Sequence, residues 1–385
     1  MAANGLGNRM LSMASTFLYA VLTDRVRLID DKADMKGLFC EPFPNSSWLV
    51  PRAFPHYNHE RHLQTYENLL QSSIARSNSS TESSPSFLYL NLQHTKDEHD
   101  RQFHCDHGQA LLRRVPAVFL NSDQYFVPTL FMTPSFNHEL TKMFPDRETV
   151  FHFLGQYLFL PSNEAWGLIT RFYRAYLANA DERTGFQVRV FNPQSVPHQT
   201  VMDQMLACAL KHGILPEVNE QNSVESLSKN WTSKAVLIAS LYPEYAENLR
   251  AMYLTKATVT GDAVGVFQPS HDEKQKFYDN QQNMKALAEM YLLSLCDVLV
   301  TSAVSTFGYV AQSLGGLKPW ILKKQNNEKT PNPPCWPALS MEPCFHYPPT
   351  YNCKAKTKLD VTSVFPYTKP CEDLRSGVKL VNEHL

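Results

Sequence analysis

Residues Asp297 to Leu322 decide the fold, and they read Asp-Val-Leu-Val-Thr-Ser-Ala-Val-Ser-Thr-Phe-Gly-Tyr-Val-Ala-Gln-Ser-Leu-Gly-Gly-Leu-Lys-Pro-Trp-Ile-Leu. The apolar run at Val298 to Val300 predicts a buried strand, and Trp320 to Leu322 predicts a second strand. Between them, a hydroxyl-rich turn leads into an amphipathic helix that is stopped by Gly315-Gly316. The stretch therefore predicts one strand-turn-helix-strand unit.

The turn of this unit is a candidate anion site. The first turn of a helix leaves backbone N–H groups unpaired and carries the positive end of the helix dipole, so it attracts anionic oxygens. Ser302, Ser305 and Thr306 add hydroxyl groups at the same place. From this stretch alone, an ordinary N-cap by Ser305 or Thr306 explains the residues equally well.

The chain before this unit alternates strands with helices, which predicts an α/β fold with a parallel sheet and right-handed crossovers. The expected elements are strands at 186–191, 235–239 and 264–268 and helices at 198–212, 243–254 and 272–296. An earlier helix, capped by Ser162 or Asn163, ends near Ala180, where we expect a domain boundary. The chain then divides into residues 1–180, residues 181–330 and a cysteine-rich extension at 331–385.

The length and charge of the chain limit the classes of function. A length of 385 residues suits two domains, since roughly 100 to 200 residues is usual for one. A formal net charge of −1 gives no basic field, so we do not expect nucleic acid as a partner, and a charged ligand must be recognised locally. No apolar run approaches the ~18 residues that span a bilayer, and we expect neither a membrane span nor a signal peptide in this chain.

The eight cysteines indicate an oxidising compartment. No pair has the Cys-x-x-Cys spacing of a zinc or redox site, so we expect disulfides in a secretory lumen rather than a metal. Buried thiols remain the alternative for Cys208 and Cys296. Three N-glycosylation sequons agree with a secretory route, at Asn45, Asn78 and Asn230.

The N-terminal motif Asn4-Gly5-Leu6-Gly7-Asn8-Arg9 precedes apolar residues at helical spacing and a predicted strand at Val26 to Ile29. This order is the second half of a β-α-β unit, whose first strand would lie before Asn4. We therefore expect a truncation or an alternative start that leaves the edge of a sheet unpaired. The motif lacks the third glycine of a dinucleotide fingerprint, which disfavours a nicotinamide-dependent dehydrogenase.

Two more strands are predicted at Phe87 to Leu92 and Ala117 to Asn121, after a low-complexity segment at 72–86 that is typical of a flexible insertion. Asp123 follows the second strand, at the end where carboxylates face the ligand crevice of an α/β sheet. The His, Asp and Glu residues between His94 and His107 match no spacing of metal ligands. We interpret them as a solvated, charged loop.

Two polar residues in the C-terminal half are further candidates. Arg189 lies in the apolar strand Gln187-Val-Arg-Val-Phe, and its planar guanidinium suits a pyrophosphate. The alternative is an internal ion pair with a carboxylate such as Glu289. His271 follows the strand at 264–268, where it either contacts a ribose or base or belongs to the cap region of the next helix.

The longest motifs together resemble one known family, the plant xyloglucan-type galactoside α-1,2-fucosyltransferases. They are Gly-Leu-Gly-Asn-Arg-Met-Leu-Ser, Val-Arg-Val-Phe, Gln-Pro-Ser-His and Leu-Cys-Asp-Val-Leu-Val-Thr-Ser-Ala-Val-Ser-Thr-Phe-Gly-Tyr-Val-Ala-Gln. The similarity runs from Asn4 to the last residues and includes Met341-Glu-Pro-Cys-Phe-His and Cys353-Lys-Ala-Lys-Thr.

The resemblance implies two Rossmann-like domains that face a cleft, the GT-B type. It implies GDP-β-L-fucose as the donor and inversion to an α-1,2 linkage on a galactose of a cell-wall glycan, most directly xyloglucan. Arg189 would then hold the GDP pyrophosphate, and the turn from Ser302 to Gly308, including Phe307, would contact the donor phosphates. Gly7, Asn8 and Arg9 would lie near the cleft between the domains.

The resemblance also implies a Golgi enzyme with a membrane helix, a stem and a strand ahead of the Gly-Leu-Gly-Asn-Arg turn, and we expect this chain to lack all three. Association with itself or with other Golgi glycosyltransferases is a further expectation.

An enzyme that transfers fucose must stabilise the leaving diphosphate and deprotonate the acceptor hydroxyl. The sequence has no Asp-x-Asp motif, which favours Arg189 and the helix start at Ser305 as metal-free stabilisers, with Asp123 as candidate base.

Two other functions remain open at this point. One is a fucosyltransferase that acts on the glycans of arabinogalactan proteins, which also carry galactosyl sites. The other is a catalytically silent product that binds a GDP-sugar or a glycan, or that acts as a partner of full-length family members.

Overall fold

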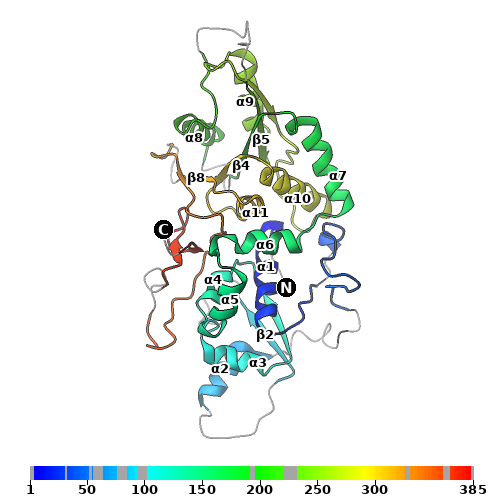
Figure 1. The fold of residues 1–385 in the computed structure, drawn as a ribbon, viewed down its shortest axis with the longest axis vertical. Helices are drawn as coiled ribbons and strands as arrows, with labels where there is room; N and C mark the ends of the chain where they lie inside the picture. The colour runs from blue at the N-terminus through cyan, green and yellow to red at the C-terminus, as the bar shows by residue number, and fades with distance from the viewer. Residues whose placement is uncertain are drawn as a thin grey trace.

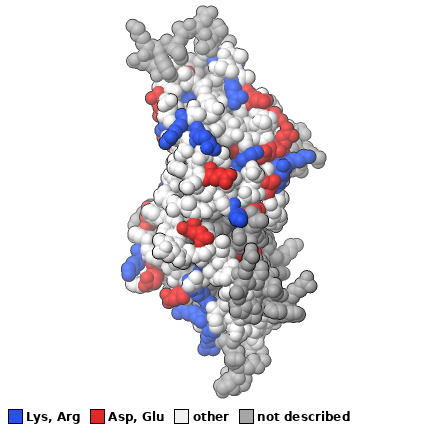
Figure 2. Space-filling model, turned by 90° about the vertical axis from the view of Figure 1, so that its right-hand side faces the viewer, with Lys and Arg blue, Asp and Glu red and all other residues white. Residues whose placement is uncertain are grey.

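The computed structural model describes residues 4–30, 33–51, 54, 64–75, 85–92, 102–190, 196–219, 232–325, 330–358 and 365–382. The described part is elongated, with a six-stranded sheet in one half and a three-stranded sheet in the other (Figure 1). Figure 2 shows basic and acidic side chains mixed over one face of the molecule, in agreement with the formal net charge of −1.

The larger sheet has the strand order β6-β5-β4-β7-β8-β9. Five of its strands are parallel, and β9 runs antiparallel to β8. The parallel strands follow the 3-2-1-4-5 order of a doubly wound Rossmann-type sheet, which confirms the predicted α/β fold. The strands are β4 (Glu182–Val188), β5 (Ser233–Ser240), β6 (Ala263–Phe267), β7 (Val298–Ser302), β8 (Trp320–Leu322) and β9 (Cys335–Pro337).

Helices cover both faces of this sheet, and β5 shows how the sequence assigns them. Val236 and Ile238 share a buried cluster with α8 (His198–Lys211) and α9 (Glu244–Thr255). Leu237 and Ala239 belong instead to the cluster that contains α10 (Asn280–Ser294) and α11 (Thr306–Gly315). Because successive side chains of a strand point to opposite faces, an unbroken apolar run is what a sheet buried on both faces needs.

The N-terminal half contains a smaller parallel sheet of order β1-β2-β3. Its strands are β1 (Gln64–Thr65), β2 (Phe87–Asn91) and β3 (Ala117–Asn121). The helices of this half are α1 (Leu6–Leu22), α2 (Tyr66–Ala75), α3 (Asp106–Arg113), α4 (Val127–Phe131), α5 (Asn137–Met143), α6 (Val150–Leu158) and α7 (Asn163–Phe172), which continues as a π-helical turn (Tyr173–Leu177). Within the described residues of this half, short 3₁₀ turns lie at Ala33–Met35, Pro134–Phe136 and Arg147–Thr149.

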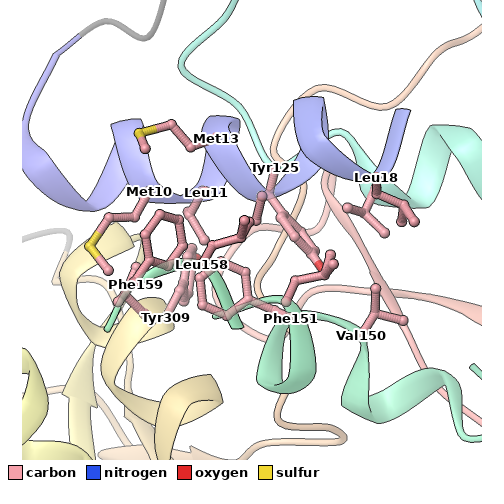
Figure 3. Packing of buried hydrophobic residues seen from close by; sticks show 14 of the residues in the cluster. Met10, Leu11, Met13, Leu18, Tyr125, Val150, Phe151, Leu158, Phe159 and Tyr309 are labelled. Atoms are coloured by element: carbon pink, nitrogen blue, oxygen red, sulfur yellow. The ribbon is translucent and has the colours of Figure 1, made fainter. Parts of the chain in front are cut away.

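One continuous core joins the two halves. Met10 and Leu11 of α1 pack with Phe151 and Leu158 of α6 and with Tyr309 of α11 (Figure 3). A second contact between the halves is made by α7, which lies against α10 (Figure 1). The start of α1 is therefore held against the start of α11 by buried apolar contacts, and this packing positions the site described below.

Several elements differ from the sequence-based predictions. No strand forms at Val26 to Ile29, where a single bridge pairs Ile29 with Leu49. The helix predicted from Asp272 begins only at Asn280, because Glu273 and Tyr278 have positive φ angles of 57° and 62° and the Asp279 side chain then caps the helix.

Two further boundaries also shift. Arg189 lies just beyond the end of β4 rather than inside the strand. Of the predicted flexible insertion, residues 72–75 form the end of α2, and residues 76–84 lie outside the described part.

Two disulfides, Cys105–Cys353 and Cys208–Cys335, tie the C-terminal extension to the rest of the fold, and a third, Cys344–Cys371, lies within the extension. The buried-thiol alternative was therefore wrong for Cys208, whereas Cys296 is a buried thiol and Cys40 an exposed one. The hairpin of β10 (Thr368–Pro370) and β11 (Val378–Leu380) completes this extension. Within the described segments, every helix is too short or too polar to pass through a bilayer.

Candidate active site

A cavity of about 380 Å³ lies where the two halves meet. It is bounded by the starts of α1 and α11, by the residues that follow β4 and β5, and by the segment that leads into α10. This is the carboxyl end of the parallel strands, where ligands bind in α/β folds. Its lining includes Asn8, Arg9, Arg189, Tyr242, Asp272, Glu289, Thr306 and Phe307.

The turn before α11 places two of its hydroxyl groups inside the protein. Ser302 Oγ accepts a hydrogen bond from the backbone N–H of Arg189 at 2.9 Å and donates one to the backbone carbonyl oxygen of Gln187 at 3.3 Å. Ser305 is the N-cap of α11 and accepts from the Gly308 N–H at 3.5 Å. Gly308 must be small, because a Cβ atom there would lie 3.0 Å from Thr301 Cβ. Thr306 and Phe307 are the residues of this turn that line the cavity.

Arg189 gives this side of the cavity its positive charge. Burial lowers the pKa of its guanidinium, but an arginine remains protonated at neutral pH. Glu289 lines the same cavity and accepts a hydrogen bond from Ser270 Oγ at 2.6 Å. Burial raises the pKa of Glu289 to about 8, so at neutral pH this carboxyl is mostly neutral and offsets little of the arginine's charge.

The start of α1 approaches α11 closely enough to require glycine. A Cβ atom on Gly7 would lie 2.9 Å from the carbonyl carbon and oxygen of Thr306. Thr306 Oγ1 donates to Asn8 Oδ1 at 2.7 Å, and Asn8 Nδ2 lies 3.4 Å from the Asp123 carbonyl oxygen. Asn8 therefore links the turn of α11 to the segment that follows β3.

Arg9 is engaged by a buried carboxylate. Its guanidinium forms an ion pair with Asp34 at 2.7 Å, and both side chains are less than 5% exposed. Asn283 of α10 donates to the same carboxylate oxygen at 3.2 Å. Although Arg9 lines the cavity, its charge is thus largely neutralised by Asp34.

Asp123 lies at the edge of the site. Its carboxylate accepts hydrogen bonds from Asn4 Nδ2 at 2.5 Å and from Gln124 Nε2 at 2.7 Å. The structure thus brings Asp123 next to the α1 turn, and its role as a base stays a prediction. His271 is exposed and is flanked by Ser270 and Asp272, which do line the cavity.

The predicted site residues therefore separate into three groups. Those that line one cavity are Gly7, Asn8, Arg9, Arg189, Thr306 and Phe307, and those that support it from behind are Ser302, Ser305 and Gly308. Asp123 and His271 lie at its margin. Of the sequons, Asn45 is exposed in a turn, and Asn78 and Asn230 lie outside the described residues.

Sequence reasoning missed Glu289 as a lining residue and proposed it only as an ion-pair partner. The signal was present, since Glu289 is a single carboxyl among the apolar residues of α10. It missed Asp34 and Tyr242 entirely.

Among the described residues, two groups of three possible metal ligands occur, His104 with Cys105 and Cys353, and Asp373 with Cys344 and Cys371. Both contain disulfide cysteines, whose sulfurs are not thiolate ligands.

Comparison with known proteins agrees with this geometry. Residues 1–354 match the family model of the xyloglucan fucosyltransferases. Over 380 residues the chain is 53% identical to a galactoside 2-alpha-L-fucosyltransferase of Pisum sativum, with 98% of this chain and 67% of that protein covered. It is 50% identical to the Arabidopsis thaliana protein of the same description, with 98% and 68% covered. A solved structure of a mutant of Arabidopsis thaliana FUT1 in complex with GDP superposes with a TM-score of 0.89 at 50% identity, over 99% of this chain and 82% of that one.

Proposed function

The chain belongs to the xyloglucan fucosyltransferase family, and from this premise we propose that it transfers L-fucose from GDP-β-L-fucose to a galactosyl hydroxyl of a cell-wall glycan. The observation that carries the proposal is the cavity between Arg189 and the start of α11. Its volume of about 380 Å³ falls in the range of small-molecule sites. The related FUT1 structure is described as a complex with GDP.

The two sides of the cavity would perform different parts of an inverting transfer. As the bond between fucose and GDP breaks, negative charge develops on the leaving diphosphate, and prepositioned donors lower the barrier most where that charge appears. Arg189 and the N–H groups at the start of α11 would supply that stabilisation, because both border the cavity. Asp123 is our candidate to accept the proton of the acceptor hydroxyl, directly or through a water molecule.

We propose that no divalent cation is needed, because the desolvated guanidinium of Arg189 supplies positive charge to the diphosphate and the sequence has no Asp-x-Asp motif. We propose xyloglucan as the acceptor, as the family description suggests, with arabinogalactan protein glycans as the second possibility. The three disulfides support placement in an oxidising lumen, for which the Golgi is our proposal.

The test is mass spectrometry of the products formed from GDP-fucose and a panel of galactosylated glycans, with and without chelator. We expect fucose to be added to a galactose-terminated xyloglucan oligosaccharide at an unchanged rate in chelator. Thermal stabilisation by GDP-fucose without turnover on any glycan would instead favour the catalytically silent alternative. Loss of activity in chelator, restored by a divalent cation, would refute the metal-free mechanism.

A further inference from the structure

Val304, two residues before the cavity-lining Thr306, has a backbone conformation that its side chain disfavours. Its φ angle of 54° lies in the left-handed region, which is strained for a residue other than glycine and unusual for a β-branched one. Val304 lies between the end of β7 and the N-cap Ser305, so its conformation determines where α11 begins. Such strain persists only where surrounding contacts hold the residue in place.

The contact that holds Val304 comes from the C-terminal extension. The Val304 N–H donates to Asp373 Oδ2 at 2.7 Å. The hydroxyl group of Tyr309, a buried residue of α11, donates to the same oxygen at 2.5 Å. One carboxylate oxygen therefore connects the strained turn to the helix that follows it.

A nearby disulfide holds the segment that carries Asp373. It lies in the connection between β10 and β11, two residues after Cys371, which is bonded to Cys344. Its second oxygen, Oδ1, is buried and receives no hydrogen bond from the described residues. A buried carboxylate oxygen without a hydrogen-bond partner is costly, so its presence calls for a compensating role.

We propose that Asp373 is a positioning residue for donor binding. It holds Val304 in the left-handed conformation, so that the first turn of α11, with Thr306 and Phe307, faces the cavity. The disulfide-linked extension would thereby take part in donor recognition without touching the donor. This inference rests on the proposed function, because it concerns the affinity of that cavity for GDP.

The test is isothermal titration calorimetry with GDP on the full chain, together with the melting temperature of each variant. We expect Asp373→Ala to weaken GDP binding by tenfold or more, because nothing then favours the left-handed turn. Asp373→Asn keeps an oxygen for the Val304 N–H and should bind within about threefold of the parent. In a Val304→Gly background, where positive φ is free of strain, Asp373→Ala should cost little affinity.

Asp146→Ala is the matched control, because Asp146 also accepts a backbone N–H, from Glu148 at 3.0 Å, away from the cavity. It should lower the melting temperature and leave GDP affinity unchanged. The inference is wrong if Asp373→Ala behaves like this control, or if Asp373→Ala costs tenfold or more in the Val304→Gly background. The latter measurement remains decisive even if Asp373→Ala alone does not fold. Failure of the parent protein to bind GDP would count against the proposed function instead.

Discussion

Two helices begin at the same cavity, α1 at Leu6 and α11 at Thr306, and they are built differently. The N-cap of α11 is Ser305, whose side chain accepts a backbone N–H, and Ser302 and Arg189 stand behind and beside it. The N-cap of α1 is Gly5, which has no side chain to offer. The charged residue near the start of α1, Arg9, is paired with the buried Asp34.

The difference indicates that the α11 side of the cavity recognises charge, whereas the α1 side determines the shape of the cavity. The α11 side presents a capped helix start and the cation of Arg189, which suit an anionic ligand. The α1 side contributes close backbone contact at Gly7 and the relay of Asn8 to Thr306 and Asp123. Changes on the α1 side should therefore act through stability and spacing, and changes on the α11 side through donor affinity and rate.

The largest effect is expected from Asp34→Ala, which would leave the Arg9 guanidinium buried without its carboxylate. Breaking a buried ion pair in this way costs about 3–5 kcal/mol of unfolding free energy, measurable by urea denaturation. Glu182→Ala is the control, because Glu182 is 56% exposed and pairs with Lys234 at the surface, where such pairs contribute about 0–1 kcal/mol. If Asp34→Ala is normally stable but no longer binds GDP, Arg9 contacts the donor, and the proposed difference between the α1 and α11 sides is wrong.

Arg189→Ala should cause the next largest effect and should act on catalysis. Removal of a donor that stabilises charge in the transition state typically lowers kcat about 10²- to 10³-fold. Arg183→Ala is the control on the same strand, since Arg183 pairs with Asp297 at the opposite end of β4. Steady-state kinetics with GDP-fucose should show the loss in Arg189→Ala alone. Equal activity of the two variants would remove Arg189 from the mechanism.

Gly7→Ala tests the spacing between the two helices. The added Cβ atom would meet backbone atoms of Thr306 at 2.9 Å, which cannot move without shifting α11. Such overpacking typically costs about 1–3 kcal/mol, and we expect donor affinity to fall with it. In Gly167→Ala the nearest atom is the end of the Arg171 side chain at 3.4 Å, so this control in α7 should be neutral or stabilising. A fully active Gly7→Ala enzyme would show that the close approach is incidental.

Much of the C-terminal half could be predicted from the sequence because its signals are local. The run at Val298, the N-cap Ser305 and the stop at Gly316, which adopts a φ of 67°, each identify an element from its own residues. The carboxyl ends of the parallel strands then locate the cavity by a general rule. Together with the family resemblance, this rule predicts Arg189 and Thr306 in one site, and both line the cavity.

The remaining features depend on partners that are distant in the sequence. Asp373 is 69 residues from Val304, and nothing near Val304 indicates a left-handed turn, since valine disfavours one. The segment at Val26 was predicted as a strand from its apolar pattern, but only Ile29 finds a partner on Leu49. The late start of α10 likewise depends on the positive φ angles of Glu273 and Tyr278, which neither residue type predicts. Tertiary contacts override local preference in all three cases.

Thr306→Val should have the smallest effect, and it tests where the two sides meet. The change keeps the volume and the helix start but removes the hydroxyl that donates to Asn8 at 2.7 Å. Loss of one such hydrogen bond costs about 0.5–1.5 kcal/mol, so KM for GDP-fucose should rise two- to tenfold with kcat nearly unchanged. Thr170→Val, which removes a hydroxyl bond to Trp166 O within α7, should leave both parameters unchanged. If Thr306→Val instead lowers kcat as far as Arg189→Ala does, the hydroxyl itself contacts the leaving diphosphate. The bond from Thr306 to Asn8 would then exist only without the donor, and the contacts of the α1 side would change when the donor binds.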